Sequence, residues 1–283
     1  MKQPPLFRQC VAECLGTYIL VFFGVGSVHV AVLTGMISGI WQVATVWAVA
    51  IAMAIYTFGS ISGSHINPAI TLAFAVFRGF EWKKVPGFIA SQVLGAILAA
   101  ATLYLLFKHL ITDFETANAI ARGQSGSELS AMIYGEYFPN PAVAKTMNWT
   151  DASVTTLQAF MGELIGTAFL AFFVFAVTEP RNAGGPGKYL LPASIGLTVA
   201  MLICIIAPLS QAGFNPARDF GPRLVAYFAG WGDIAIPGPR GGFFTVYILA
   251  PIIGSLIGAG VFQHVIHPAY HTHEEELTDV HIQ

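Results

Sequence analysis

The sequence predicts an all-α membrane protein with six transmembrane helices and two re-entrant half-helices, arranged as an inverted repeat. Of its 283 residues, 55% are hydrophobic and 10% are charged, with a mean hydropathy of +0.67, whereas a soluble domain carries roughly 25% charged residues. Six apolar stretches are long enough to cross about 30 Å of hydrocarbon. Asn-Pro-Ala follows a loop containing Gly and Ser at residues 67–69 and again at 215–217.

Polar or Gly/Pro-rich segments of different lengths separate the predicted spans. The spans cover residues 10–33, 41–59, 85–107, 157–177, 190–206 and 243–266. Residues 34–40 form an uncharged turn and residues 108–155 a long polar connection. We expect one transmembrane domain over 1–283, with a first repeat at 1–150, a second at 151–283, and a polar tail from about residue 267.

The two halves repeat each other in sequence. Residues 12–23 and 162–173 share a glutamate, a glycine, a threonine and a pair of phenylalanines at the same spacing. Three spans per half is an odd number, so the second copy enters the membrane from the opposite side. Inverted repeats of this kind place their functional site near the midplane.

Each Asn-Pro-Ala predicts a helix start, because asparagine is a favoured N-cap and proline fits the first helical position. Gly79 and Gly230 follow soon after, so each helix has about 10 residues and rises about 15 Å, half of a bilayer core. Two such helices would meet N-terminus to N-terminus, with their loops lining a water-filled path. The motif residues are Asn67, Pro68, Ala69, Asn215, Pro216 and Ala217.

Basic residues predict the orientation, since they favour cytoplasmic loops. Lys2, Arg8, Arg78, Lys83, Lys84, Arg181 and Lys188 fall on one side, and Lys108, Arg122, Lys145 and Arg240 on the other. We therefore expect a multi-pass protein of the plasma (inner) membrane with both termini in the cytoplasm. There is no basic cluster for nucleic acid, and no nucleophile–base pair or phosphate-binding loop for an enzyme; we expect no cofactor, disulfide or metal.

Two opposed helix N-termini would each carry about half a positive charge, which raises a barrier to cations and protons. The Asn67 and Asn215 side chains would cap their helices and keep their NH₂ groups free for a passing oxygen. Acceptor carbonyls are predicted at Gly63, Ser64, His65, Gln211, Ala212 and Gly213, and an apolar wall at Ile51, Ile66, Val199 and Phe214. This environment suits a neutral molecule bearing hydroxyl groups.

These features resemble the aquaporin (major intrinsic protein) family over nearly the whole chain. The glycerol-facilitator branch is indicated by Tyr-Phe-Pro-Asn-Pro at 137–141 and Ala-Gly-Trp-Gly at 229–232. Further branch markers are Asp219, Arg223, Pro251 and Ile252. The resemblance implies a passive channel for glycerol, other small neutral polyols and water that excludes ions. It also implies a homotetramer in membrane lipid, with one pore per subunit.

By the same resemblance, the narrowest ring comprises Trp47, Ile203, Ala212 and Arg218. Arg218 would donate to hydroxyl oxygens and repel cations, and Trp47 would offer an apolar face. Glycerol facilitators usually carry an aromatic residue in place of Ala212 and glycine in place of Ile203. The combination here is similar to nodulin-26-like channels, so urea, larger polyols and uncharged metalloid hydroxides are further candidate solutes.

Glu13 and Glu163 are the repeated carboxylates, and Gln92 lies in the third span. We expect each carboxylate to accept hydrogen bonds from the backbone of a pore loop, with Gln92 in a similar role. Alternatively, the carboxylates could couple transport to protons, which would make the protein a secondary transporter. A water-selective channel and a structural junction protein are further alternatives, and Arg218 could instead pair with Asp219 in a solvated loop.

Overall fold

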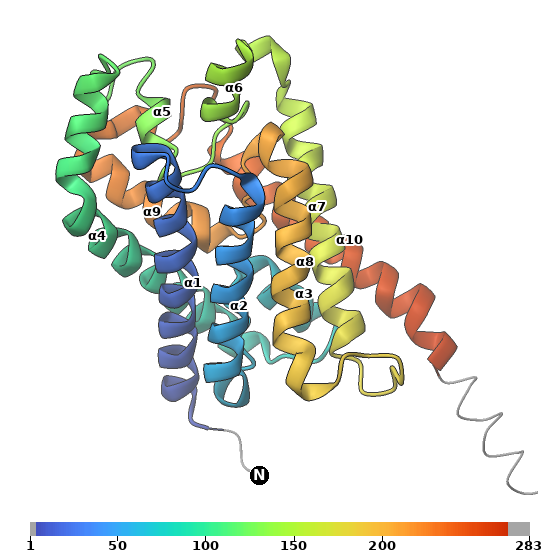
Figure 1. Ribbon diagram of the computed structural model, residues 1–283. Helices are drawn as coiled ribbons and strands as arrows, with labels where there is room; N and C mark the ends of the chain where they lie inside the picture. Colours follow the sequence, from blue (N-terminus) through green and yellow to red (C-terminus); the bar gives the residue numbers. More distant parts are fainter. Residues whose placement is uncertain (1–3, 271–283) are drawn as a thin grey trace, which may run out of the picture.

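A computed structural model describes residues 4–270, and Figure 1 shows its arrangement of helices. In that part of the chain, six helices are long and apolar enough to cross a membrane, which confirms the predicted fold class. They are α1 (Leu6–Thr34), α2 (Ile40–Ser62), Trp82–Ala117, α7 (Thr156–Val177), α8 (Gly187–Ser210) and Thr245–Tyr270. The third comprises η1 (Trp82–Lys84) and α4 (Val85–Ala117); the sixth includes η5 (Thr245–Leu249), α10 (Ala250–Val261) and η6 (Phe262–Ile266).

The remaining elements are short. The two half-helices are α3 (Pro68–Phe77) and α9 (Pro216–Ala226). The connections contain α5 (Glu128–Ala131), α6 (Pro141–Met147), η2 (Asp151–Ser153), η3 (Tyr227–Trp231) and η4 (Gly232–Ile234). Gly79, with a φ of 68°, follows the end of α3, and Gly230, with a φ of 107°, ends the turn after α9. These are left-handed conformations that glycine adopts without strain.

Several spans are longer than the sequence predicts. α4 continues ten residues past Phe107, because Ile111 and Glu115 are buried beneath the following loop although Lys108 interrupts the apolar run. α8 continues to Ser210 through Pro208, where the loop residue Asn140 donates to the helix carbonyl oxygens of Ala207 and Pro208. The last helix reaches Tyr270, past the predicted end of the sixth span at residue 266; residues 271–283 of the predicted tail lie outside the described residues.

Helix packing repeats between the halves. α1 packs against α4 and α2, and α7 packs against α10 and α8 in the same way. A close helix contact repeats as well: a Cβ on Gly95 would collide with the carbonyl of Cys14, and one on Gly254 with that of Leu164. Each half-helix contacts the opposite half, α3 on α10 and α9 on α4, and α2 meets α8 between them.

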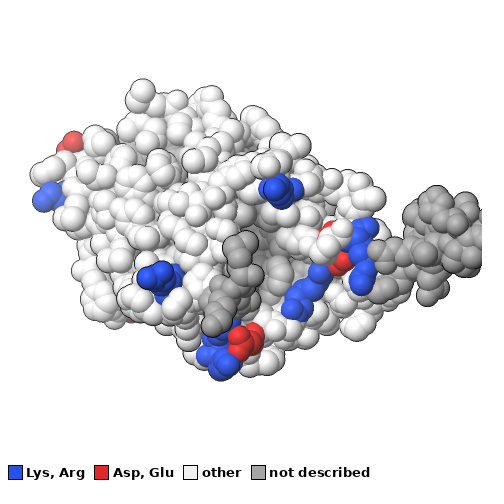
Figure 2. All heavy atoms as spheres, turned by 90° about the horizontal axis from the view of Figure 1, so that it is seen from below, with Lys and Arg blue, Asp and Glu red and all other residues white. Residues whose placement is uncertain are grey.

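The two ends of the bundle differ. Leu6 and Tyr270 lie at one end, here called the terminal face, and α5 and α6 lie at the other, the loop face (Figure 1). Figure 2 shows Lys and Arg side chains scattered over the terminal face, with fewer Asp and Glu. Large apolar side chains are exposed on the outside of the spans, as contact with lipid requires; they include Val49, Met53, Leu105, Phe169, Leu197 and Ile205.

Candidate functional site

The half-helices α3 and α9 begin side by side in the interior, and each is capped by its own asparagine. Asn67 Oδ1 accepts from the backbone N–H of Ala69 at 2.9 Å. Asn215 Oδ1 accepts from Ala217 N at 3.1 Å and from Arg218 N at 3.3 Å. These bonds satisfy N–H groups that a helix start leaves without partners.

The two asparagines also cross-link the loops. Asn67 Nδ2 donates to the carbonyl oxygen of Phe214 at 2.9 Å, and Asn215 Nδ2 donates to that of Ile66 at 2.8 Å. We expected both NH₂ groups to be free, and the structure corrects this expectation. Each amide donates one N–H to a backbone carbonyl oxygen of the opposite loop. One N–H of each amide remains for a solute.

A buried glutamate supports each loop from behind. Glu13 accepts from Ser62 Oγ at 2.6 Å and from the backbone N–H groups of His65 and Ile66 at 2.9 and 2.7 Å. Gln92 Nε2 donates to the same carboxylate at 2.8 Å. With its N–H groups held at the back, the loop turns its carbonyl groups to the other side.

Glu163 repeats this arrangement in the second half. It accepts from Ser210 Oγ at 2.6 Å and from the N–H groups of Gly213 and Phe214 at 2.9 and 2.8 Å. Neither glutamate is exposed. Within the described residues, no hydrogen bond reaches the carbonyl oxygens of Gly63, Ser64, His65, Ala212 or Gly213.

A single cavity of about 590 Å³ runs past the half-helix tips. Gly39 and Lys145 line it toward the loop face, and Thr178 and Leu191 line it toward the terminal face. Both loops reach it from Gly63 to Asn67 and from Gln211 to Asn215, as do the predicted wall residues Ile51 and Val199. Glu13, Glu163 and Gln92 stand behind the loops and do not line it, and the His65 ring packs within 5 Å of the rings of Phe74 and Phe80.

The four residues expected at the constriction all line this cavity: Trp47, Ile203, Ala212 and Arg218. The Arg218 guanidinium lies over the Trp47 ring, 4.6 Å from its centroid, a distance at which a cation is attracted by the ring face. Arg218 Nη1 also donates to the carbonyl oxygen of Tyr134 at 3.4 Å. Ala212 has a φ of 65°, so the loop is in a left-handed conformation at this point.

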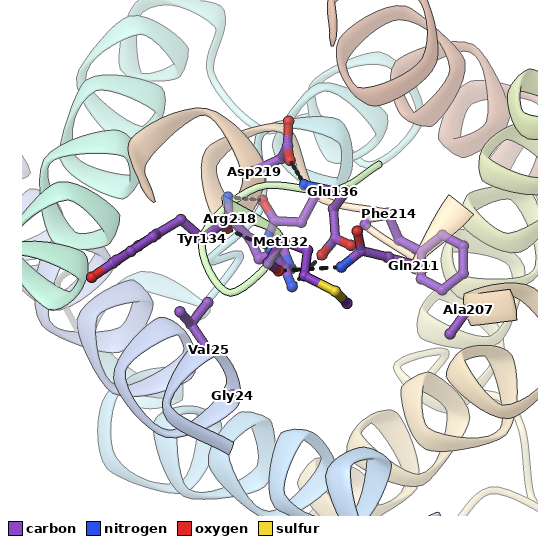
Figure 3. Close-up of polar contacts among 12 residues, drawn as sticks. Gly24, Val25, Met132, Tyr134, Glu136, Ala207, Gln211, Phe214, Arg218 and Asp219 are labelled. Atoms are coloured by element: carbon purple, nitrogen blue, oxygen red, sulfur yellow. Dashed lines mark hydrogen bonds and ion pairs between the residues drawn. The ribbon is translucent and has the colours of Figure 1, made fainter. Parts of the chain in front are cut away.

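Sequence reasoning missed Glu136, which lies in the long connection and also lines the cavity. Its carboxylate forms an ion pair with Arg218, so Arg218 does not pair with Asp219 as the alternative reading allowed. Figure 3 shows Glu136, Arg218 and Gln211 close together. Glu136 directly precedes the branch motif at 137–141, but nothing in the sequence marks it as the partner of Arg218.

The branch markers Asp219 and Arg223 hold this loop rather than line the cavity. They pair with each other at 2.6 Å. Asp219 Oδ1 accepts from the backbone N–H of Glu136 at 2.7 Å, and Arg223 Nη2 donates to the Glu136 carbonyl oxygen. Pro251 and Ile252 lie in α10, next to Ser255, whose hydroxyl donates to the carbonyl oxygen of Ala69 at 2.9 Å.

A third Asn-Pro-Ala occurs at residues 140–142, outside the half-helices. Asn140 caps α6 through Ala142 N at 3.0 Å and Val143 N at 3.3 Å. Its Nδ2 donates to the carbonyl of Ala207 at 3.1 Å. The tripeptide therefore marks a capped helix start in all three places, and its position decides what that start faces.

Gly24 sets the position of the Trp47 ring. A Cβ on Gly24 would collide with the indole, and Trp47 lines the cavity. We expect Gly24→Ala to displace the ring into the cavity and slow solute flux by roughly tenfold, since an overpacked side chain moves toward open space. The solute flux is measured from the swelling of vesicles that contain the purified variant.

Gly26→Ala is the matched control for that variant. It lies on the same helix, and its Cβ would be 3.3 Å from the flexible Leu103 side chain, so its flux should equal that of the wild type. Equal flux in both variants would contradict the placement of Trp47 at the constriction.

Comparison of the sequence with known proteins identifies the family to which the chain belongs. Residues 1–262 match the sequence profile of the family described as Major intrinsic protein. The chain belongs to this family. Among other major intrinsic proteins, it is 42% identical over 264 residues to a glycerol uptake facilitator protein of Pseudomonas aeruginosa, covering 93% of this chain and 90% of that one.

Two further relatives have similar coverage. The glycerol uptake facilitator protein of Escherichia coli K12 is 40% identical over 91% of this chain and 88% of its own length. The propanediol uptake facilitator PduF of Citrobacter freundii is 39% identical over 92% of this chain and 93% of its own. The X-ray structure of the Plasmodium falciparum aquaglyceroporin matches with a TM-score of 0.80 over 95% of this chain and 100% of that chain; at 23% identity it shows the fold.

Proposed function

We propose that the chain forms a passive membrane channel for glycerol and related small neutral polyols, which also passes water and excludes ions and protons. The observation that carries this proposal is the cavity that runs past both half-helix tips with the two loops along it. Facilitated diffusion needs no cofactor and no chemical step. The relatives named for glycerol and propanediol uptake support the choice of solute.

The walls of the cavity match the two sides of a polyol. The loops offer carbonyl oxygens and one N–H from each of Asn67 and Asn215 to the hydroxyl groups. The carbon chain can lie against Trp47, Ile51 and Val199. A neutral solute thus exchanges its hydration for hydrogen bonds and apolar contact, whereas an ion loses hydration without equal compensation.

Protons and cations meet a different obstacle. The N-termini of α3 and α9 both point at the cavity midplane, and each carries about half a positive charge. A water molecule that accepts from Asn67 and Asn215 together directs its hydrogens away from both, so a continuous proton wire is interrupted. We propose these two asparagines as the proton-excluding residues and Trp47, Ile203, Ala212 and Arg218 as the selectivity ring.

A solute panel on purified protein in lipid vesicles tests this function. We expect water and glycerol to enter far faster than in empty vesicles, and polyols to enter more slowly as they lengthen. Fast water flow with glycerol excluded would identify a water-selective channel instead. Uptake driven by a pH gradient would identify a proton-coupled transporter, and background flux of all solutes a structural role.

The proposal includes the orientation of the chain in the membrane and its assembly with other subunits. The basic side chains on the terminal face (Figure 2) favour a cytoplasmic location for both termini in the plasma (inner) membrane. We propose a homotetramer with one pore per subunit. The cavity lies within one chain, so conduction itself does not depend on the number of subunits.

A further inference from the structure

The charges around the pore raise the question of what keeps small anions out. Among the described residues that line the cavity, the Lys, Arg, Asp and Glu side chains are Lys145, Arg218 and Glu136. Two helix N-termini add positive partial charge at the midplane, and such termini attract anions. The features that repel cations would therefore draw nitrate or chloride inward if nothing opposed them.

Glu136 is the acidic group in this set, and it lies against Arg218. The Glu136 side chain is 0% exposed and that of Arg218 is 7% exposed, so the pair is shielded from bulk solvent, where screening would weaken it. Lys145 is farther out and donates to Asn118 Oδ1 at 2.7 Å. The charge at the constriction itself is therefore set by Arg218 and Glu136.

We propose that Glu136 is a specificity-determining residue that excludes small anions by neutralising Arg218 at the constriction. The proposal rests on the channel function proposed above and assigns one part of its selectivity. An anion approaching from the loop face meets a neutral pair instead of an isolated guanidinium. Neutral polyols still find guanidinium N–H donors, since Arg218 has five and the pair does not use all of them.

The fold holds Glu136 in place through its backbone. Its N–H donates to Asp219 Oδ1 at 2.7 Å, and its carbonyl oxygen accepts from Arg223 Nη2. Because these bonds do not involve the carboxylate, Glu136→Gln changes the charge and leaves the loop anchored. The glutamine keeps the side-chain length and one carbonyl oxygen for Arg218.

The carboxylate is titratable, which gives a second test without a variant. Arg218, Asp219 and Arg223 face it from α9, Glu163 from α7 and Tyr247 from η5. Burial raises the pKa of Glu136 to about 8, and Arg218 opposes the rise. The carboxylate is therefore ionised in alkaline solution and gains a proton as the external pH falls. Protonation leaves Arg218 uncompensated, so anion permeability should increase toward acid pH.

Nitrate permeability of vesicles containing the purified protein tests the proposal, with glycerol swelling measured on the same preparation. At pH 9, we expect Glu136→Gln to pass nitrate at least about tenfold faster than the wild type, because one charge at the constriction changes the barrier steeply. Its glycerol flux should remain well above that of empty vesicles, which shows that the pore of the variant is intact. Wild-type nitrate permeability should rise between pH 9 and pH 6, while that of Glu136→Gln should stay constant.

Asp151→Asn is the matched control, because Asp151 is exposed in the same connection and its loss changes net charge equally. It should behave as the wild type at both pH values. The proposal is overturned if Glu136→Gln passes glycerol but remains as tight to nitrate as the wild type at pH 9, or if wild-type nitrate permeability does not change between the two pH values. A wild type that passes no glycerol would instead refute the channel function.

Discussion

Replacing Glu13 by leucine is expected to abolish glycerol flux and to lower the free energy of unfolding by several kcal/mol, since each buried donor left without a partner costs about 1–3 kcal/mol. The carboxylate accepts four hydrogen bonds, from Ser62, His65, Ile66 and Gln92. Leucine leaves these buried donors unpaired, and each such loss is costly. Denaturation in detergent micelles measures stability, and vesicle swelling measures flux.

Glu13→Gln and Glu163→Leu complete this test. Glutamine keeps one acceptor oxygen, so the stability and flux of Glu13→Gln should lie between those of the wild type and those of Glu13→Leu. Glu163→Leu removes three hydrogen bonds in the other half and should cause a similar loss. A Glu13→Leu protein with normal stability and flux would contradict the support role. If solute uptake responded to a pH gradient and Glu13→Gln lost only that response, proton coupling would be favoured instead.

Replacing Asn215 by aspartate should admit protons and small cations at least about tenfold faster, because a negative charge at the midplane offsets the positive helix termini. Aspartate can still cap Ala217 and Arg218, so α9 should begin normally. It cannot donate to the Ile66 carbonyl oxygen, a bond that Asn215 makes at 2.8 Å. A pH-sensitive dye inside the vesicles records the proton flux.

The third Asn-Pro-Ala provides a control within the same chain. Asn140→Asp makes the same substitution at a capped helix start, in the connection near the loop face. We expect it to leave proton exclusion unchanged. If Asn140→Asp and Asn215→Asp leak equally, or if neither leaks, the charge of the half-helix tips does not control proton passage.

The half-helices could be predicted from sequence because their signals are local. An asparagine cap, a proline at the first helical position and a glycine after about ten residues define a short helix without reference to the rest of the chain. Glu13 and Glu163 could be singled out because they repeat. The third Asn-Pro-Ala shows the limit of such signals, since an identical tripeptide at 140–142 starts a helix near the loop face.

Glu136 could not be assigned from sequence because its contacts are not local. Its position depends on contacts across more than 80 residues, from Asp219 and Arg223 to its backbone and from Arg218 to its carboxylate. No periodicity or spacing encodes such a contact. The free NH₂ groups expected for Asn67 and Asn215 were partly wrong for the same reason, because their partners are carbonyl groups of the opposite half.

Whether the pore conducts polyols without conducting protons is decided by measuring glycerol and proton flux simultaneously in the same vesicles. We expect glycerol entry well above that of empty vesicles together with proton flux at the empty-vesicle level, if Asn67 and Asn215 pass hydroxyl groups and interrupt proton wires as proposed. Glycerol entry no faster than in empty vesicles, or proton flux that rises in proportion to the glycerol flux, would contradict this expectation.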